Sequence, residues 1–365
     1  MLTFDELYSW VKDLPVIDWH NHLDLGMIEA DNPLGSLYEV WVKADPYKHR
    51  AMRICGVPER LITGDASDAA KMAAWGATLP KLVGNPLFAW SRQELAFLNE
   101  ELKINDEELS IGNLRNVSLS ALTPKKLLAA FNVEYYDPGY RMNAGDGLDL
   151  EQMDAVGVRG GRVLDVSIDD IASVDAREFV EVGREAVRRG WTMLLHLGAL
   201  RRTSARLRAV AGPAGGFAGM RAPVDPQKVA ELLDVLEAAD ALPRTILLSL
   251  NPEAHAQLAV LAGSFNGEGM PGKVQLGPAW WWCDHEEGIR DVLEKNAAYG
   301  VLSTFVGMTT DSRSLLSFVR HDYFRRILCQ WTAEKIAAGK FPDDAALIRP
   351  LLENICYRNA KEMVK

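Results

Sequence analysis

The chain has 365 residues, 48% of them hydrophobic, and a formal net charge of −10. That length and composition suffice for a large buried core, and the acidic charge argues against nucleic acid or a membrane surface as the main partner. The four cysteines lie far apart without a Cys-x-x-Cys pair, so we expect reduced thiols in a cytoplasmic protein. We expect no signal peptide, and no apolar stretch approaches the length of a membrane span.

Short apolar runs flanked by Gly, Pro or Asp alternate with helical segments along most of the chain. Such runs are typical of strands buried on both faces, and the alternation favours an α/β fold with a parallel sheet. We expect a (β/α) barrel of the TIM type, with its site at the C-terminal ends of the strands. The expected strands are Val16–Asn21, Val133–Tyr136, Arg162–Ser167, Thr192–Gly198, Thr245–Leu250, Lys273–Gly277 and Leu302–Met308.

A long segment from Asp24 to Lys126, rich in Trp, Leu and Pro, interrupts this alternation. Its pattern predicts helices over Glu39–Val57 and Asp68–Trp75. We interpret residues 25–128 as a helical insertion between the first two strands, which covers the mouth of one barrel domain spanning residues 1–365. Its tryptophans would also supply an interface for a homo-oligomer.

Three helices between the later strands have clear end signals, with an acidic N-cap in each and a C-terminal glycine in two. They start at Asp175, Asp225 and Asp284, and the first and third end at Gly190 and Gly300. The glycine-rich stretch Gly212–Gly219 lacks the lysine and the spacing of phosphate-binding loops, so we expect a flexible loop near the site.

The most informative motif is Asp18-Trp19-His20-Asn21-His22, directly after the first apolar run. Alternating side chains of a strand place His20 and His22 on one face, where two imidazoles can hold a divalent ion. Asp311 follows the last apolar run, and His196 lies near the exit of a middle strand. Because barrel strands end at one rim, we expect these four residues to form an open site for Zn²⁺ or Mn²⁺.

Other roles compete for these residues. His196 would otherwise be a core histidine, and Asp311 would cap the next helix. The remaining histidines are expected in ordinary structural places: His255 in solvent, His285 in the first turn of a helix, His321 in a basic helix and His49 in a charged segment.

Taken together, the motifs resemble the uronate isomerase (glucuronate isomerase) family of the amidohydrolase superfamily. The matching segments follow the family order through most of the chain. They are Asp18–Leu23, Tyr47–Arg53, Ile62–Ser67, Gly84–Leu87, Leu195–Arg201, Ile246–Pro252, Trp280–His285, Phe305–Ser314, Arg320–Arg326 and Ile355–Lys361.

The resemblance implies a distorted, metal-dependent barrel that interconverts D-glucuronate with D-fructuronate, and D-galacturonate with D-tagaturonate, through an enediol. It implies that His20, His22 and Asp311 bind the ion, with Zn²⁺ preferred and Mn²⁺ as the alternative. Asp311, Tyr47 and His196 would be catalytic, and the acidic sugar would contact Arg313, Arg201, His49 and Trp281.

The chain departs from the family pattern on the substrate side. Pro46 replaces a histidine of the family's Asp-His-Tyr-Lys-Trp-Arg run, and Ile168 stands where its Phe-Arg-Pro-Asp run has a substrate-binding arginine. The family's Asp-His-Gly run is absent. With seven expected strands, the barrel either contains one irregular strand or has lost a βα unit.

Three functions are therefore compared. The first is isomerisation of a hexuronate or of another small sugar acid. The second is metal-dependent hydrolysis of a lactone or amide, although no lysine stands at a strand exit to be carbamylated. The third is a non-catalytic binding protein, which the retained histidines, Asp311 and Arg313 argue against. Bound metal separates the third from the others, and ketose production separates the first from the second.

Overall fold

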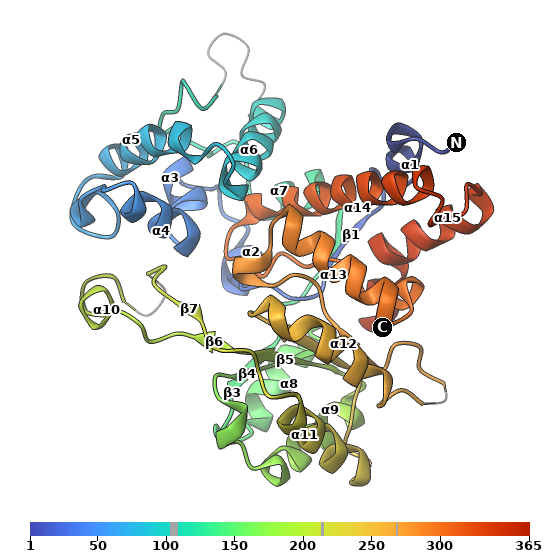
Figure 1. Cartoon of the computed structure of the whole chain (residues 1–365). Helices are drawn as coiled ribbons and strands as arrows, with labels where there is room; N and C mark the ends of the chain where they lie inside the picture. The colour runs from blue at the N-terminus through green and yellow to red at the C-terminus, as the bar shows by residue number, and fades with distance from the viewer. Residues whose placement is uncertain (103–108, 213–214, 268) are drawn as a thin grey trace.

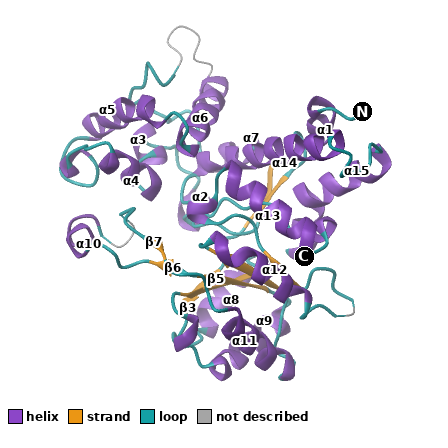
Figure 2. Ribbon diagram, viewed as in Figure 1, coloured by secondary structure: helices purple, strands orange, loops and turns teal. Residues whose placement is uncertain are grey.

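The computed structural model describes residues 1–102, 109–212, 215–267 and 269–365. Its centre is a five-stranded parallel sheet in the order β3-β4-β5-β8-β9, beside a separate parallel pair, β1-β2 (Figures 1 and 2). A short antiparallel pair, β6-β7, projects from this body. The strands are β1 Val16–Asp18, β2 Val133–Tyr136, β3 Tyr140–Asn143, β4 Val163–Ile168, β5 Thr192–Leu197, β6 Ala199–Leu200, β7 Gly219–Met220, β8 Thr245–Ser249 and β9 Val274–Leu276.

Helices lie above and below the central sheet in the view of Figure 2. Helices α8 and α9 contact β3 and β5, and their apolar faces share one large hydrophobic cluster with the sheet. The helices are α1 Phe4–Val11, α2 Leu25–Ala30, α3 Leu37–Trp41, α4 Pro46–Ile54, α5 Asp68–Thr78, α6 Pro86–Leu102, α7 Pro124–Ala130, α8 Leu150–Val158, α9 Phe179–Arg189, α10 Ala205–Ala211, α11 Pro226–Ala238, α12 His255–Gly263, α13 Glu286–Tyr299, α14 Val319–Ala337, α15 Ala345–Glu353 and α16 Asn359–Met363.

The strand β3 was not predicted. It pairs with β4 in parallel register from Tyr140 opposite Leu164 to Asn143 opposite Ser167. Tyr140 and Met142 are buried while the residues between and after them are exposed, so this edge strand alternates instead of forming an apolar run. Asp137, Pro138 and Gly139 alone separate β3 from β2, with no helix between the two strands, so β3 adds no βα unit to the barrel.

The strand predicted over Leu302–Met308 is wrong. Leu302–Thr304 form a 3₁₀ turn, and the residues that follow do not join a sheet. Side chains replace the missing ladder, because Val306 N donates to Gln275 Oε1 at 3.0 Å. Gly307 adopts a φ of +70°, and a Cβ there would lie 2.1 Å from the Ile355 carbonyl oxygen. The barrel is therefore open at this position.

Between β1 and β2, the described residues form α2 to α7, here called the cap, of which α3 to α6 lie at the upper left in Figure 1. The single helix expected over Glu39–Val57 is two helices, α3 and α4. Asp45 ends the link between them, because its carboxylate accepts hydrogen bonds from Tyr47 N and Lys48 N, and Pro46 fits the first helical position. The cap core also includes Leu315, Leu316 and Phe318, which precede α14 and join the cap to the barrel.

Two local predictions need correction. His285, rather than Asp284, caps α13, since its Nδ1 accepts a hydrogen bond from Gly288 N. His255 is buried instead of solvated, with Nδ1 at 2.8 Å from Asp291 Oδ2. The predicted loop Gly212–Gly219 lies partly outside the described residues. Among the described helices, none combines the length and apolar character needed to cross a bilayer.

Candidate metal and substrate site

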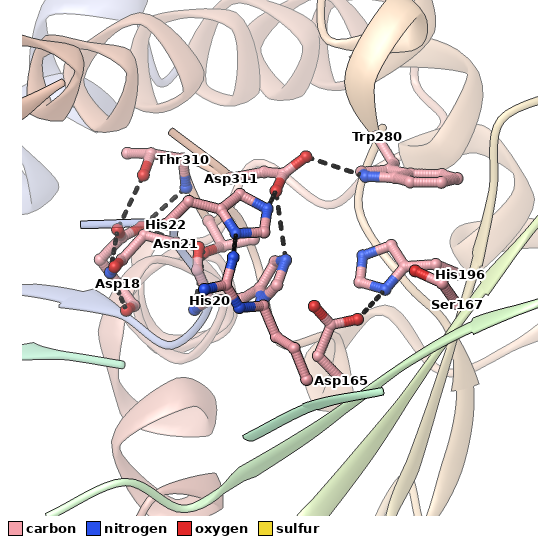
Figure 3. Close-up of polar contacts among 12 residues, drawn as sticks. Asp18, His20, Asn21, His22, Asp165, Ser167, His196, Trp280, Thr310 and Asp311 are labelled. Atoms are coloured by element: carbon pink, nitrogen blue, oxygen red, sulfur yellow. Dashed lines mark hydrogen bonds and ion pairs between the residues drawn. The ribbon is translucent and has the colours of Figure 1, made fainter. Parts of the chain in front are cut away.

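Three residues from opposite ends of the chain meet beyond β1. Asp311 Oδ1 lies 3.2 Å from His20 Nε2 and 2.9 Å from His22 Nε2 (Figure 3). Both histidines follow the strand rather than lying within it, and their ring centroids are 5.2 Å apart. Asp311 has a φ of +47°, which is uncommon for a residue other than glycine and suggests local strain at this position.

Asp18, at the end of β1, holds His20, His22 and Asp311 in this arrangement. Its fully buried carboxylate accepts hydrogen bonds from Thr310 N at 2.6 Å and from Thr310 Oγ1 at 2.8 Å. Asn21 Nδ2, Thr309 Oγ1 and His321 Nε2 also contact it, at 3.0, 3.0 and 3.1 Å. Because these groups flank both His20 and Asp311, Asp18 holds the two ligand-bearing segments together.

A second buried pair adjoins these residues. Asp165 of β4 places Oδ1 2.7 Å from Nδ1 of His196 on β5, and the His196 ring centroid lies 4.9 Å from that of His20 (Figure 3). Trp280 packs on His196 with centroids 4.5 Å apart and donates its indole N–H to Asp311 Oδ2 at 2.9 Å. The two pairs therefore form one continuous cluster.

The donor atoms of this cluster fit a divalent cation. Both ring nitrogens of His20 and of His196 are buried, as are Oδ1 of Asp165 and of Asp311, and within the described chain none of them has a partner in hydrogen-bond geometry. The ligand atoms of His20, His22 and Asp311 all lie within 4.8 Å of one another, and so do those of His20, Asp165 and His196. Imidazole nitrogen and carboxylate oxygen suit Zn²⁺ and Mn²⁺.

The electrostatics of the cluster also favour a cation. Burial lowers the pKa of His20, but the carboxylates of Asp165 and Asp311 outweigh it and raise this pKa to about 9. Burial acts to raise the pKa of Asp311, yet its contacts with His20 and His22 hold it well below the ordinary value. For His22 burial prevails and lowers the pKa. Two ionised carboxylates thus face the ligand position.

A cavity of about 440 Å³ opens onto the cluster. Of the residues predicted from the sequence, it is lined by His20, His22, His196, Asp311, Tyr47, Trp281, Arg201 and Arg313. His49 is not among the lining residues of the described chain, and its ring is buried within the cap. Sequence reasoning missed the other lining residues, among them Asp165, Trp280, Arg202 and Arg208.

The cap brings Tyr47 to this cavity at the start of α4. Its ring makes edge contacts with Trp90 and Trp282, at centroid distances of 5.9 and 5.1 Å. The buried Arg320 guanidinium lies 5.4 Å from the Tyr47 ring centroid. Burial raises the pKa of Tyr47 well above its ordinary value, although the charge of Arg320 acts to lower it. Tyr47 is therefore a neutral phenol at rest.

Two arginines make polar contacts near the C-terminal ends of the strands. Arg201 donates from Nε to Asp169 Oδ1 and from Nη2 to Ser167 Oγ, both at 2.9 Å. Arg141, on the strand that sequence analysis missed, places Nη1 2.8 Å from Nδ1 of His22. A guanidinium only donates hydrogen bonds, so Nδ1 of His22 accepts this one. When Nε2 of a neutral His22 binds an ion, Nδ1 carries the proton and Arg141 must turn to another acceptor.

In this α/β barrel, histidines and aspartates at the strand ends meet at a cavity. This arrangement is typical of metal-dependent barrel enzymes. The model of the glucuronate isomerase family matches residues 3–136 and 151–364. The chain therefore belongs to the glucuronate isomerase family and is an isomerase of hexuronates.

Solved structures agree on the fold. The uronate isomerase of Thermotoga maritima is 23% identical, with a TM-score of 0.81 over 99% of this chain and 97% of that one. For the glucuronate isomerase of Caulobacter crescentus the values are 19%, 0.82, 99% and 93%. A uronate isomerase of Bacillus halodurans is 14% identical, with a TM-score of 0.71 over 99% of this chain and 96% of that one.

Proposed function

We propose that the protein interconverts D-glucuronate with D-fructuronate, and D-galacturonate with D-tagaturonate, using one divalent ion held by His20, His22 and Asp311. The observation that carries this proposal is that imidazole nitrogens and a carboxylate oxygen lie within metal-binding distance of one another at a cavity that also presents Tyr47 and arginines. Zn²⁺ is the preferred ion, because two imidazoles and one carboxylate with an open position form a common catalytic zinc site.

The arginines orient the sugar. Its carboxylate pairs with Arg201 and Arg313, which places the opposite end of the open-chain sugar at the ion. Trp281 supports this placement, because it lines the cavity and its ring centroid lies 5.9 Å from the Arg201 guanidinium carbon. The ion, when bound, polarises the carbonyl and stabilises the negative charge of the enediolate.

The proton moves between C2 and C1 on Tyr47. Burial keeps the phenol neutral at rest, Asp311 assists Tyr47 in carrying the proton, and the positive charge of Arg320 stabilises the phenolate form of Tyr47 during the transfer. His196 exchanges a proton with the hydroxyl oxygens through Nε2, while Asp165 faces its Nδ1. These roles divide acid–base work between the cap and the barrel.

The test is incubation of metal-analysed protein with each uronate while ketose formation is followed. We expect ketose from the wild type and none from His20→Ala. His285→Asn is the matched control, because it removes an imidazole outside the cavity while asparagine still caps α13. If the protein contains metal but forms no ketose from either uronate, the proposal is contradicted. Hydrolysis of a lactone or amide would then be the next reaction to assay.

A further inference from the structure

The cavity is strongly basic within an acidic protein. Arg201, Arg202, Arg208 and Arg313 all line it, in a chain whose net charge is −10. The only carboxylates among its described lining residues are Asp165 and Asp311, which belong to the ligand cluster. With a divalent ion in place, the cavity holds much more positive charge than the single carboxylate of a hexuronate can balance.

Two of the four guanidiniums, those of Arg201 and Arg313, are placed to bind the single carboxylate of a hexuronate. Arg201 is held in position by Asp169 and Ser167. Arg313 stands two residues after Asp311 and is close enough for its charge to act on the His22 ring. A carboxylate is commonly bound by one or two guanidiniums, so this pair suffices for it.

Arg202 and Arg208 are not needed to bind that carboxylate. Both line the cavity, and within the described chain the guanidinium of neither forms a hydrogen bond or an ion pair. They belong to residues 199–212 and 215–220, here called the arm, which contains β6, α10 and β7 and extends beneath the cap in Figure 1.

The arm is fastened to the cap rather than free. Arg50 of α4 donates to the Ala218 carbonyl oxygen at 3.2 Å, and Arg53 donates to that of Gly215. A Cβ on Gly216 would lie 2.2 Å from the Pro46 carbonyl oxygen, so the arm and α4 are packed closely. This docking holds Arg202 and Arg208 at the cavity without neutralising them.

We propose that the substrate is a uronate carrying a second anionic group, either a phosphate ester or a second uronyl carboxylate, which Arg202 and Arg208 bind. This inference rests on the proposed function, in which the aldehyde end reacts at the ion and the first carboxylate pairs with Arg201 and Arg313. The second group takes no part in the proton transfer and keeps all its bonds. It adds binding energy and distinguishes this substrate from a simple hexuronate.

The experiment compares galacturonate with 4-linked digalacturonate, whose reducing end can isomerise in the same way. Ketose formation and calorimetric binding are measured for the wild type, for Arg202→Ala/Arg208→Ala and for Arg206→Ala. Arg206 is the matched control, because it is an exposed arginine of α10, which also carries Arg208, and it does not line the cavity. Inorganic phosphate is tested in parallel as a competitive inhibitor.

We expect digalacturonate to exceed galacturonate by at least about tenfold in kcat/KM, and the double variant to lose about that factor, as for loss of a charge-assisted contact. Phosphate inhibition that depends on Arg202 and Arg208, without a preference for digalacturonate, would identify the second group as a phosphate. Equal kcat/KM for both sugars, together with arginine-independent phosphate inhibition, would overturn the inference. Arginine-dependent binding of digalacturonate without any ketose would support the anion subsite and contradict the proposed function.

Discussion

The two ends of the cavity are built in opposite ways. At the metal end, the buried Asp18 carboxylate meets five partner groups and locks the segments that carry His20 and Asp311. At the arginine end, Arg202 and Arg208 stand on the arm, whose strands have two residues each and whose helix has seven. Saturated buried networks fix one geometry, whereas long side chains on short elements keep rotamer freedom. The metal end is thus suited to set the reaction, and the arginine end to select the sugar.

The largest expected effect comes from breaking the metal end. Asp311→Ala removes the carboxylate that both His20 and His22 face, so we expect loss of bound metal and a decrease in kcat/KM of at least about 10³-fold. Elemental analysis and the ketose assay measure the two effects. Asp169→Asn, at the arginine end, should keep its metal, and full activity of Asp311→Ala would rule out our assignment of the ligands.

A substitution of Tyr47 distinguishes a loss of catalysis from a loss of bound metal at the same end of the cavity. Tyr47→Phe keeps the ring contacts with Trp90 and Trp282 but removes the hydroxyl. We expect kcat to decrease by about 10²- to 10⁴-fold, the usual range for general acid–base catalysis, with metal content unchanged. A variant in which only KM rises would assign Tyr47 to sugar binding instead.

A substitution of Asp284 tests how much the buried charges near Tyr47 lower the stability of the folded protein. Burial raises its pKa to about 6, although the Arg320 guanidinium partly opposes this shift. A raised carboxyl pKa means that its stabilising contribution is complete below about pH 4 and is lost as the pH rises through about 6. Asp284→Asn should therefore be more stable than the wild type by about 3 kcal/mol at pH 8.

Thermal unfolding between pH 4 and pH 8 measures this difference. The two proteins should converge toward pH 4, where Asp284 is protonated in both the folded and the unfolded chain. A variant that is less stable than the wild type at pH 8 would mean that the contact with Arg320 outweighs burial of the carboxylate.

The smallest expected effect lies at the arginine end. Asp169→Asn weakens the ion pair that holds Arg201, which is about one-third exposed, so we expect KM for the uronate to rise by about two- to fivefold with kcat retained. Initial rates over a range of uronate concentrations give both constants. A loss in kcat equal to that from Tyr47→Phe would erase the distinction between the two ends.

The sequence and the structure agree best where chemistry leaves a residue pattern. The α/β barrel was predictable from the alternation of apolar runs and helices, and His20, His22, His196 and Asp311 were selected because metal-ligand residue types followed such runs. The structure brings these four together. Asp165 left a usable signal that was overlooked, namely a carboxylate inside the apolar run Val163–Ile168.

Other features were hidden for physical reasons. The strand β3 alternates buried and exposed residues, so a search for apolar runs passes over it, and residues 137–150 also fall outside the match to the family. Residues 305–310 have strand-like composition, yet side chains such as Gln275 replace the ladder. Arg202 and Arg208 could not be assigned to a cavity without knowing that the arm docks beneath α4.

The docking of the arm has a consequence for how this enzyme can diversify. Arg50 and Arg53 grip main-chain carbonyl oxygens, which every residue possesses, so their hold is largely indifferent to the side chains that the arm displays. Among the described glycines of the arm, Gly216 is the one that closely approaches the cap. Mutations elsewhere in the arm can therefore change the charge presented to the sugar without unfastening it, so substrate preference can drift while the metal centre is left untouched.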